Sequence, residues 1–181
     1  MAYSLKLNTP RLTIVGINEV NIHDLIHYQL NNQKHLLQSG GYVPKTTQEV
    51  EKIYQQWLNN TERDIEVRFF IYRHQQLIGL AGITNIIRGS FQAGYLGYNL
   101  AESEQGNGYM TEALEEITAF GFCALNLHRI MANYRPDNLA SGRVLEKVGY
   151  VKEGVAEKYL QVNGIWEDHV LTAAINDHWQ S

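Results

Sequence analysis

The sequence predicts a mixed α/β (α+β) fold in which helices flank one mostly antiparallel sheet of seven strands. Two observations support this prediction. Strand-like runs in the middle of the chain are joined by short turns, which requires antiparallel pairing. The second half alternates strand and helix patterns, which requires parallel pairing. The 181 residues contain three prolines and no linker-like tract, so a single domain spanning residues 1–181 is expected.

The first third is predicted to form one strand and three helices. Residues 11–16 are rich in branched side chains, which favours a strand. Asn18 is expected to cap a helix that runs to about residue 30, because apolar residues recur there at three- and four-residue spacing. A short helical segment follows to about residue 37. Thr46 or Thr47 is expected to cap a third helix with the same spacing.

The remaining elements follow from similar patterns. Three strands joined by short turns are predicted at residues 66–73, 76–87 and 93–100. Helical spacing then predicts a helix at 109–125, a strand at 128–134 and a helix at 138–148 that Gly149 ends. Two final strands, residues 150–159 and 165–174, are expected to form a hairpin around Asn163-Gly164.

Composition excludes several classes of protein. Hydrophobic residues make up 44% and the net charge is −4, which is typical of a globule and does not favour direct DNA binding. The chain contains no run of about 20 apolar residues, and Met1 to Pro10 show no signal-peptide pattern, so neither a membrane nor a secreted location is expected. The single cysteine, Cys123, is expected to be a core thiol in a cytoplasmic protein. His23 and His27 lack a third ligand, so no metal site is expected.

A glycine-containing turn, Gln105-Gly106-Asn107-Gly108, lies between a predicted strand and a predicted helix. Glycines adopt backbone conformations that a side chain would block, and they let a ligand approach the main chain. The first amides of the following helix are unpaired and lie at the positive end of the helix dipole. This arrangement favours a phosphate group.

Two common phosphate-binding patterns do not fit this turn. The P-loop pattern requires Lys and then Ser or Thr after its last glycine, whereas Tyr109 and Met110 follow Gly108. The dinucleotide pattern requires a third glycine, whereas position 111 is Thr111. Taken alone, the turn is equally compatible with a glycine-rich helix start that binds nothing.

Residues 105–110 resemble the Gln/Arg-x-x-Gly-x-Gly/Ala signature of the Gcn5-related N-acetyltransferase superfamily, with Met110 at its last position. The segment from Asn138 to Tyr150 resembles the second segment of that superfamily, an Asn-led helix that ends at glycine and an aromatic residue. The predicted order of elements agrees with the superfamily over nearly the whole chain. The resemblance implies a fold with a splayed central strand pair and acetyl-CoA (CoA) as the cofactor.

Shorter segments are similar to the ribosomal-protein N-terminal acetyltransferases, the RimJ/RimL branch, and most similar to its RimJ type. They are residues 88–91, 95–98, 128–134, 153–154 and 166–173. This branch implies that the acceptor is the N-terminal alanine or serine of a ribosomal protein, or another peptide amine, and that the enzyme is a monomer or a homodimer. Residues 20–65 are expected to shape the acceptor pocket. A small-molecule amine as acceptor, or a non-catalytic CoA-binding ribosome-assembly module, stay open as alternatives.

The resemblance also implies which residues hold the cofactor. The strand before the turn would pair with the pantetheine amides as an added strand would. Asn138 or its neighbour Asp137 could simply cap the helix, and the family pattern adds a hydrogen bond from Asn138 to the cofactor. The implied cofactor-binding residues are Leu96, Gly97, Tyr98, Asn99, Leu100, Gln105, Gly106, Asn107, Gly108, Tyr109, Met110, Thr111, Asn133, Asn138 and Ser141.

Catalytic roles are also implied by the resemblance. Many relatives place a tyrosine acid at the position of Leu145, and leucine cannot act as an acid. The resemblance to the ribosomal branch implies instead that Ser141 stabilises or protonates the leaving sulfur, although a surface serine on a helix is the alternative. The family's acidic residues at the positions of Leu96 and Leu160 are absent. The base that accepts the proton of the amine must therefore be sought among other residues. An α-amino group has a pKa of about 7.7–8.0, so a water relay or one weak base suffices. The candidates are Glu157, Tyr159 and Asp168.

Overall fold

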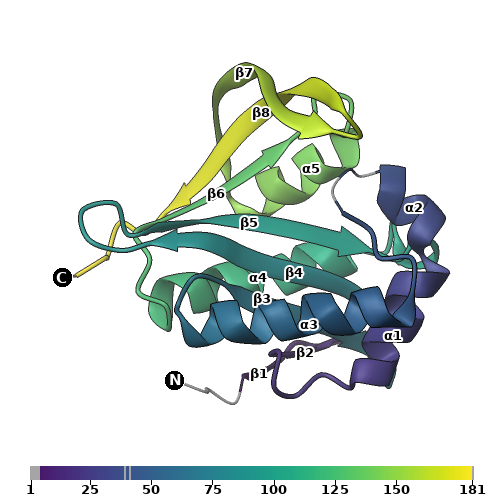
Figure 1. Cartoon of the computed structure of the whole chain (residues 1–181). Coiled ribbons are helices and arrows are strands. Elements are labelled where there is room, and N and C mark those ends of the chain that lie inside the picture. Colours follow the sequence, from purple (N-terminus) through teal and green to yellow (C-terminus); the bar gives the residue numbers. More distant parts are fainter. Residues whose placement is uncertain (1–4, 39, 41, 181) are drawn as a thin grey trace.

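The computed structural model describes residues 5–38, 40 and 42–180. It confirms a mixed, mostly antiparallel sheet flanked by helices, but the sheet has eight strands instead of seven (Figure 1). The additional strand, β1 (Lys6–Asn8), pairs antiparallel with β2 (Thr13–Val15). A three-residue strand is too short to show an alternating pattern, so its existence depends on the partner strand. The strands lie in the order β1-β2-β3-β4-β5-β6-β8-β7.

The helices that follow β2 begin where side chains cap them. Asn21, not Asn18, caps α1 (Ile22–Asn31) by accepting a hydrogen bond from the His23 amide. Asn18 is excluded as the cap because residues 16–20 form a turn in which the Gly16 carbonyl accepts from the amides of residues 19 and 20. After α2 (Gln33–Gln38), Thr46 caps α3 (Thr47–Glu62), as expected.

The predicted antiparallel meander is confirmed. It consists of β3 (Val67–Arg73), β4 (Gln76–Ile87) and β5 (Ala93–Leu100). A short 3-10 helix, Glu102–Glu104, connects β5 to the glycine-containing turn.

The second half also follows the predicted order. The helix α4 (Tyr109–Cys123) connects β5 to β6 (Arg129–Tyr134), and this connection makes the pair parallel. The helix α5 (Leu139–Val148) ends at Gly149, and β7 (Val151–Val162) and β8 (Ile165–Ile175) form the final hairpin. Both hairpin turn residues have positive φ, as this type of turn requires.

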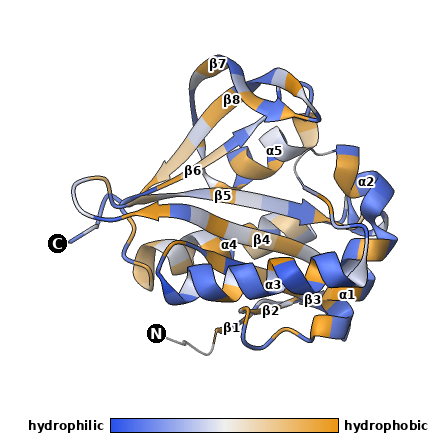
Figure 2. Ribbon diagram, viewed as in Figure 1, coloured by the Kyte–Doolittle hydropathy of each residue, from blue (hydrophilic) through white to orange (hydrophobic). Residues whose placement is uncertain are grey.

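Helices cover both faces of the sheet, so much of the meander is buried on both sides (Figure 1). On one face, Phe69 and Ala81 pack with Leu114 and Ile117 of α4. The opposite face places the next residues in sequence, such as Phe70, against α1 and α3. In Figure 2, α3 is mostly hydrophilic in colour, consistent with a surface helix that buries one stripe.

The expectation that Cys123 is a core thiol is wrong, because the side chain is exposed. The buried face of α4 includes Ile117 and Gly121. A residue two positions after Gly121 points to the opposite side of a helix, since each residue turns by about 100°. Among the described residues, no helix combines the length and apolarity needed to cross a membrane.

Candidate active site

The sheet opens between its two parallel central strands. β5 and β6 pair only from Ala93 to Tyr95 on one side and from Arg129 to Met131 on the other. Beyond this point the two strands, both fully described, diverge while β4 continues to pair with β5 as far as Leu100. Figure 1 shows β6, β8 and β7 turning away from β5 together. The splayed central pair is therefore present, and one edge of residues 96–100 is available for a ligand backbone.

The glycine-containing turn has the geometry expected of a phosphate site. Gly106 and Gly108 have φ of 76° and 78°, a region that residues with a side chain rarely adopt. Gly108 is the N-cap residue of α4 and offers no capping side chain, so the first amides of the helix stay free for a ligand. The Asn107 side chain donates to the carbonyls of Glu104 and Gln105, which fixes the shape of the turn.

An arginine that the sequence analysis did not identify stabilises this turn from outside. Arg11 forms an ion pair with Glu112 at 2.6 Å and donates to the Asn107 carbonyl at 2.9 Å. Its guanidinium also lies over the Tyr109 ring, 4.7 Å from the ring centre. Because Arg11 is about a hundred residues away in sequence, no local pattern connects it to the turn.

The open edge and the turn border one cleft of about 410 Å³. Most of the predicted cofactor residues line it. They are Tyr98, Asn99, Leu100, Gln105, Gly106, Gly108, Tyr109, Met110, Thr111, Asn138 and Ser141.

The other four predicted cofactor residues are not among those that line this cleft. Leu96 is buried in the core, and Gly97 lines the neighbouring pocket on the other face of the sheet. The Asn107 carbonyl contacts Arg11, and the Asn133 side chain donates to the Tyr159 hydroxyl.

Positive side chains in this cleft were not predicted from the sequence. Arg143 and Lys147 extend from α5, one helical turn apart, and line the cleft. His35 of α2 also lines it and contacts the Gln105 side chain at 3.0 Å. The spacing of Arg143 and Lys147 could have indicated a shared helix face, but only the packing of α5 beside the turn shows which face is used.

Ser141 and Tyr98 meet across the cleft. Their hydroxyl oxygens are 2.7 Å apart, and Tyr98 also lies 3.3 Å from the Ser141 carbonyl. Burial raises the pKa of Tyr98 to about 12, so the phenol keeps its proton at neutral pH. Leu145 is almost fully buried in the core next to these residues. Asn138 caps α5 through its side-chain oxygen, which leaves its amide nitrogen available in the cleft.

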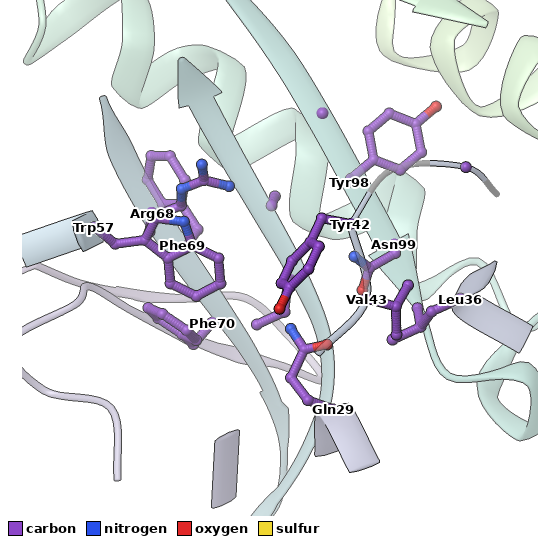
Figure 3. A pocket seen from close by; sticks show the side chains of 14 residues that line it. Gln29, Leu36, Tyr42, Val43, Trp57, Arg68, Phe69, Phe70, Tyr98 and Asn99 are labelled. Carbon is purple, nitrogen blue, oxygen red and sulfur yellow. The ribbon is translucent and has the colours of Figure 1, made fainter. Parts of the chain in front are cut away.

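A second pocket, of about 240 Å³, lies on the opposite face of the sheet (Figure 3). It shares Tyr98 and Asn99 with the first cleft, so the two cavities meet at β5 where the sheet opens. Asn99 is held by a 2.7 Å hydrogen bond from the Tyr28 hydroxyl. As expected, residues between 20 and 65 contribute much of the lining. They are Gln29, Leu36, Gly40, Tyr42, Val43 and Trp57.

The remaining catalytic candidates lie on the β7–β8 hairpin. Tyr159 contacts Asn133 at 3.3 Å, and burial together with the nearby Tyr95 hydroxyl raises the pKa of Tyr159. Asp168 is exposed and accepts a hydrogen bond from the Lys158 amide at 2.8 Å, where an irregularity interrupts the pairing of β7 with β8. Glu157 is exposed. Of the three, the structure brings only Tyr159 into contact with β6 beside the opening.

Comparisons with known proteins agree with this geometry. Residues 11–151 match the family described as "Acetyltransferase (GNAT) domain". The [ribosomal protein uS5]-alanine N-acetyltransferase of Escherichia coli (strain K12) is 46% identical over 105 residues, which are 58% of this chain and 54% of that protein. The chain thus spans about half the length of this curated relative.

Solved structures extend the similarity over nearly the whole chain. The ribosomal-protein-S5-alanine acetyltransferase from Vibrio fischeri superposes with a TM-score of 0.87 at 31% identity, covering 98% of this chain and all of that one. Mycobacterium smegmatis RimJ in complex with CoA-disulfide gives a TM-score of 0.84 at 27% identity, covering 94% of this chain and 84% of that one. This chain belongs to the GNAT acetyltransferase family and is similar to its RimJ members.

Proposed function

We propose that this chain is an acetyl-CoA-dependent N-acetyltransferase whose acceptor is the N-terminal alanine, or serine, of a ribosomal protein. The observation that supports it most is the opening beyond Tyr95 and Met131, which joins a cleft ending at a phosphate-binding turn to a pocket on the other face. Direct transfer requires the two substrates to meet at one point. The similarity to ribosomal-protein alanine acetyltransferases supports the choice of acceptor.

The first cleft has the groups that CoA requires. The free edge of residues 96–100 would pair with the pantetheine amides, and the amides of the Gly106–Gly108 turn and of α4 would bind the pyrophosphate. Arg143 and Lys147 would add donors and positive charge near the phosphates. Bound there, acetyl-CoA supplies the activated acetyl group and a thiol leaving group.

Ser141 would stabilise the departing sulfur. In the transfer, the amine nitrogen bonds to the acetyl carbon and the carbon–sulfur bond breaks, so the sulfur gains negative charge and then a proton. The Ser141 hydroxyl can donate to this sulfur while Tyr98 donates to the Ser141 oxygen over 2.7 Å. Because Tyr98 stays protonated at neutral pH, it can hold Ser141 in the donating orientation.

The amine requires little help from the protein to lose its proton. An α-amino group with a pKa of about 7.7–8.0 is substantially neutral at physiological pH, whereas a lysine amine near 10.4 is not. A tyrosine hydroxyl keeps its proton at neutral pH, and burial together with Tyr95 raises the pKa of Tyr159 further, so Tyr159 would act as a hydrogen-bond donor instead of a base. We propose that Tyr159 and Asn133 orient the amine or a water beside the opening, and that water receives the proton.

A panel of acceptors tests this proposal. The protein is incubated with acetyl-CoA and peptides that begin with Ala, Ser or Met, and in parallel with spermidine and an aminoglycoside, and products are identified by mass. Addition of one acetyl group to the N-terminus of the Ala- or Ser-initiated peptides is expected. Acetylation of spermidine or the aminoglycoside without any peptide product would contradict the proposal and favour a small-molecule acceptor.

A further inference from the structure

One row across the sheet combines an arginine with two glycines. Arg68 of β3 is paired with Gly82 of β4, which is paired with Gly97 of β5. A Cβ atom at Gly82 would lie 3.1 Å from the Arg68 Cδ and Nη1 atoms, so the arginine side chain extends over this glycine toward β5. A Cβ atom at Gly97 would meet nothing within 4 Å. The two glycines therefore leave space in which the guanidinium faces the opening of the sheet.

The guanidinium is held firmly in this position. Its Nη2 atom forms an ion pair with Glu66 at 2.5 Å, and Asn60 donates to the other carboxylate oxygen of Glu66 at 2.9 Å. The guanidinium also lies over the Trp57 ring, 4.6 Å from the ring centre. Figure 3 shows Arg68 and Trp57 side by side at one end of the pocket. A planar guanidinium stacked on an aromatic ring loses little further entropy when it binds a ligand.

The arginine also has hydrogen-bonding capacity to spare. Within the described part of the chain, its side-chain hydrogen bonds go to Glu66 through Nη2, while Nη1 lies on the side of Gly82. Arg68 is the only charged residue among the described residues that line the pocket. Because its charge is balanced by Glu66, the pocket presents donors without a strong net charge. This combination suits a carbonyl oxygen and does not favour a polycation.

A peptide terminus has a carbonyl oxygen at the required place. Three covalent bonds separate this oxygen from the α-amine nitrogen, so an amine located at Gly97 can direct its own carbonyl toward the Arg68 end of the same pocket. Polyamines and lysine side chains have no such oxygen. Gln29, Tyr42 and Asn99 also line the pocket and can contact the following peptide group.

We infer that Arg68 is the specificity-determining residue for the acceptor: it binds the carbonyl oxygen next to the reacting amine and so restricts the substrate class to α-aminoacyl amides and peptides. This inference rests on the proposed N-terminal acetylation. Beyond that proposal, it names Arg68 and the carbonyl oxygen next to the amine as the two groups whose contact determines which amines are accepted.

The test compares two small acceptors, alaninamide and isopropylamine. Isopropylamine is alaninamide with a methyl group in place of the carboxamide, so it lacks the carbonyl oxygen. Arg68→Met is made together with Glu66→Gln, because removal of one partner alone would leave a buried charge unpaired. Arg68→Lys retains the charge without the planar fork. Arg88→Met is the control, since Arg88 forms a similar ion pair with Asp64 on the surface. Circular dichroism and the KM for acetyl-CoA confirm that each variant is folded.

The quantity measured is the ratio of kcat/KM for alaninamide to that for isopropylamine, in which differences in amine pKa cancel between variants. The ratio is expected to fall roughly 10- to 100-fold in the double variant through a higher KM for alaninamide, less in Arg68→Lys, and not at all in Arg88→Met.

Three outcomes would overturn the inference, and they are distinguishable. Peptide acetylation with an unchanged ratio in the double variant would exclude a role for Arg68 and leave the proposed function intact. Acetylation of isopropylamine but not of alaninamide by the unaltered enzyme would reject both. If the double variant lost activity toward the dipeptide Ala-Asp but retained activity toward alaninamide, Arg68 would bind a carboxylate instead of the carbonyl oxygen.

Discussion

Removal of the Ser141 hydroxyl is expected to slow the step in which the carbon–sulfur bond breaks. A hydrogen bond to a charged group contributes about 1.5–3 kcal/mol, which corresponds to a decrease in kcat of roughly 10- to 150-fold in Ser141→Ala. In the proposed mechanism Tyr98 acts through Ser141, at 2.7 Å, by a hydrogen bond between neutral groups. Its loss in Tyr98→Phe is worth about 0.5–1.5 kcal/mol, or roughly 2- to 12-fold in kcat.

These two effects should not multiply. Once Ser141 is alanine, Tyr98 has no hydroxyl to orient, so Ser141→Ala/Tyr98→Phe should be about as slow as Ser141→Ala alone. Thiol release from acetyl-CoA, followed with a thiol-reactive dye at saturating peptide, measures kcat for all variants.

A matched control is available in the same core. The Tyr150 hydroxyl contacts the Thr118 hydroxyl at 3.1 Å in a buried site, and neither residue is among those that line the cleft. Tyr150→Phe should lower stability by about 1 kcal/mol and leave kcat unchanged. An unchanged kcat in Ser141→Ala, or a double variant whose loss equals the full product of the single losses, would refute this account of the leaving group.

Three further predictions concern the turn, the cap and alkaline stability. Gly108→Glu should weaken acetyl-CoA binding roughly 100-fold by calorimetry, because a carboxylate and a side chain at positive φ both oppose phosphate binding; Gly89→Glu, at an exposed glycine with φ of 75°, should not. Asn138→Ala and Thr46→Ala each remove an N-cap worth about 1 kcal/mol, measured by urea unfolding, but only the former should raise the KM for acetyl-CoA. The folded state raises the pKa of Tyr98 from 10.0 to about 12, so the stabilisation it provides is present below about pH 10 and is lost between about pH 10 and 12. The free energy of unfolding of Tyr98→Phe should therefore fall less steeply over this pH range than that of the unaltered protein. An equal fall in the two proteins would exclude Tyr98 as a contributor to the loss of stability at alkaline pH.

Sequence patterns predicted most of the elements because they depend on neighbours in the chain. The meander, the α4 crossover and the hairpin at Asn163-Gly164 all arise from spacing within short windows. Two of the failures have the same origin. β1 exists only because β2 lies beside it, and the exposure of Cys123 depends on which face of α4 packs against the sheet.

Most residues that line the larger cleft were predictable for a similar reason. The turn from Gln105 to Gly108 and the helix that begins after Asn138 are local signals, and each brings its own backbone geometry to the cleft. The structure added Arg11, which contacts the turn at Asn107, and the cationic residues of α5 that line the cleft. Their contribution depends on packing between segments that are distant in sequence.

The sequence alone determined that this chain places a glycine-containing turn before a helix on a mixed sheet, because positive φ at glycines and free helix amides are properties of a few consecutive residues. Only the tertiary structure showed what faces that turn. The divergence of β5 from β6, the contact of Ser141 with Tyr98, and the row from Arg68 to Gly97 each join strands or helices that no local pattern connects. The pocket lined by Arg68 and Gly97 therefore depends on the register of three strands, since a shift by one residue would turn Arg68 to the opposite face of the sheet.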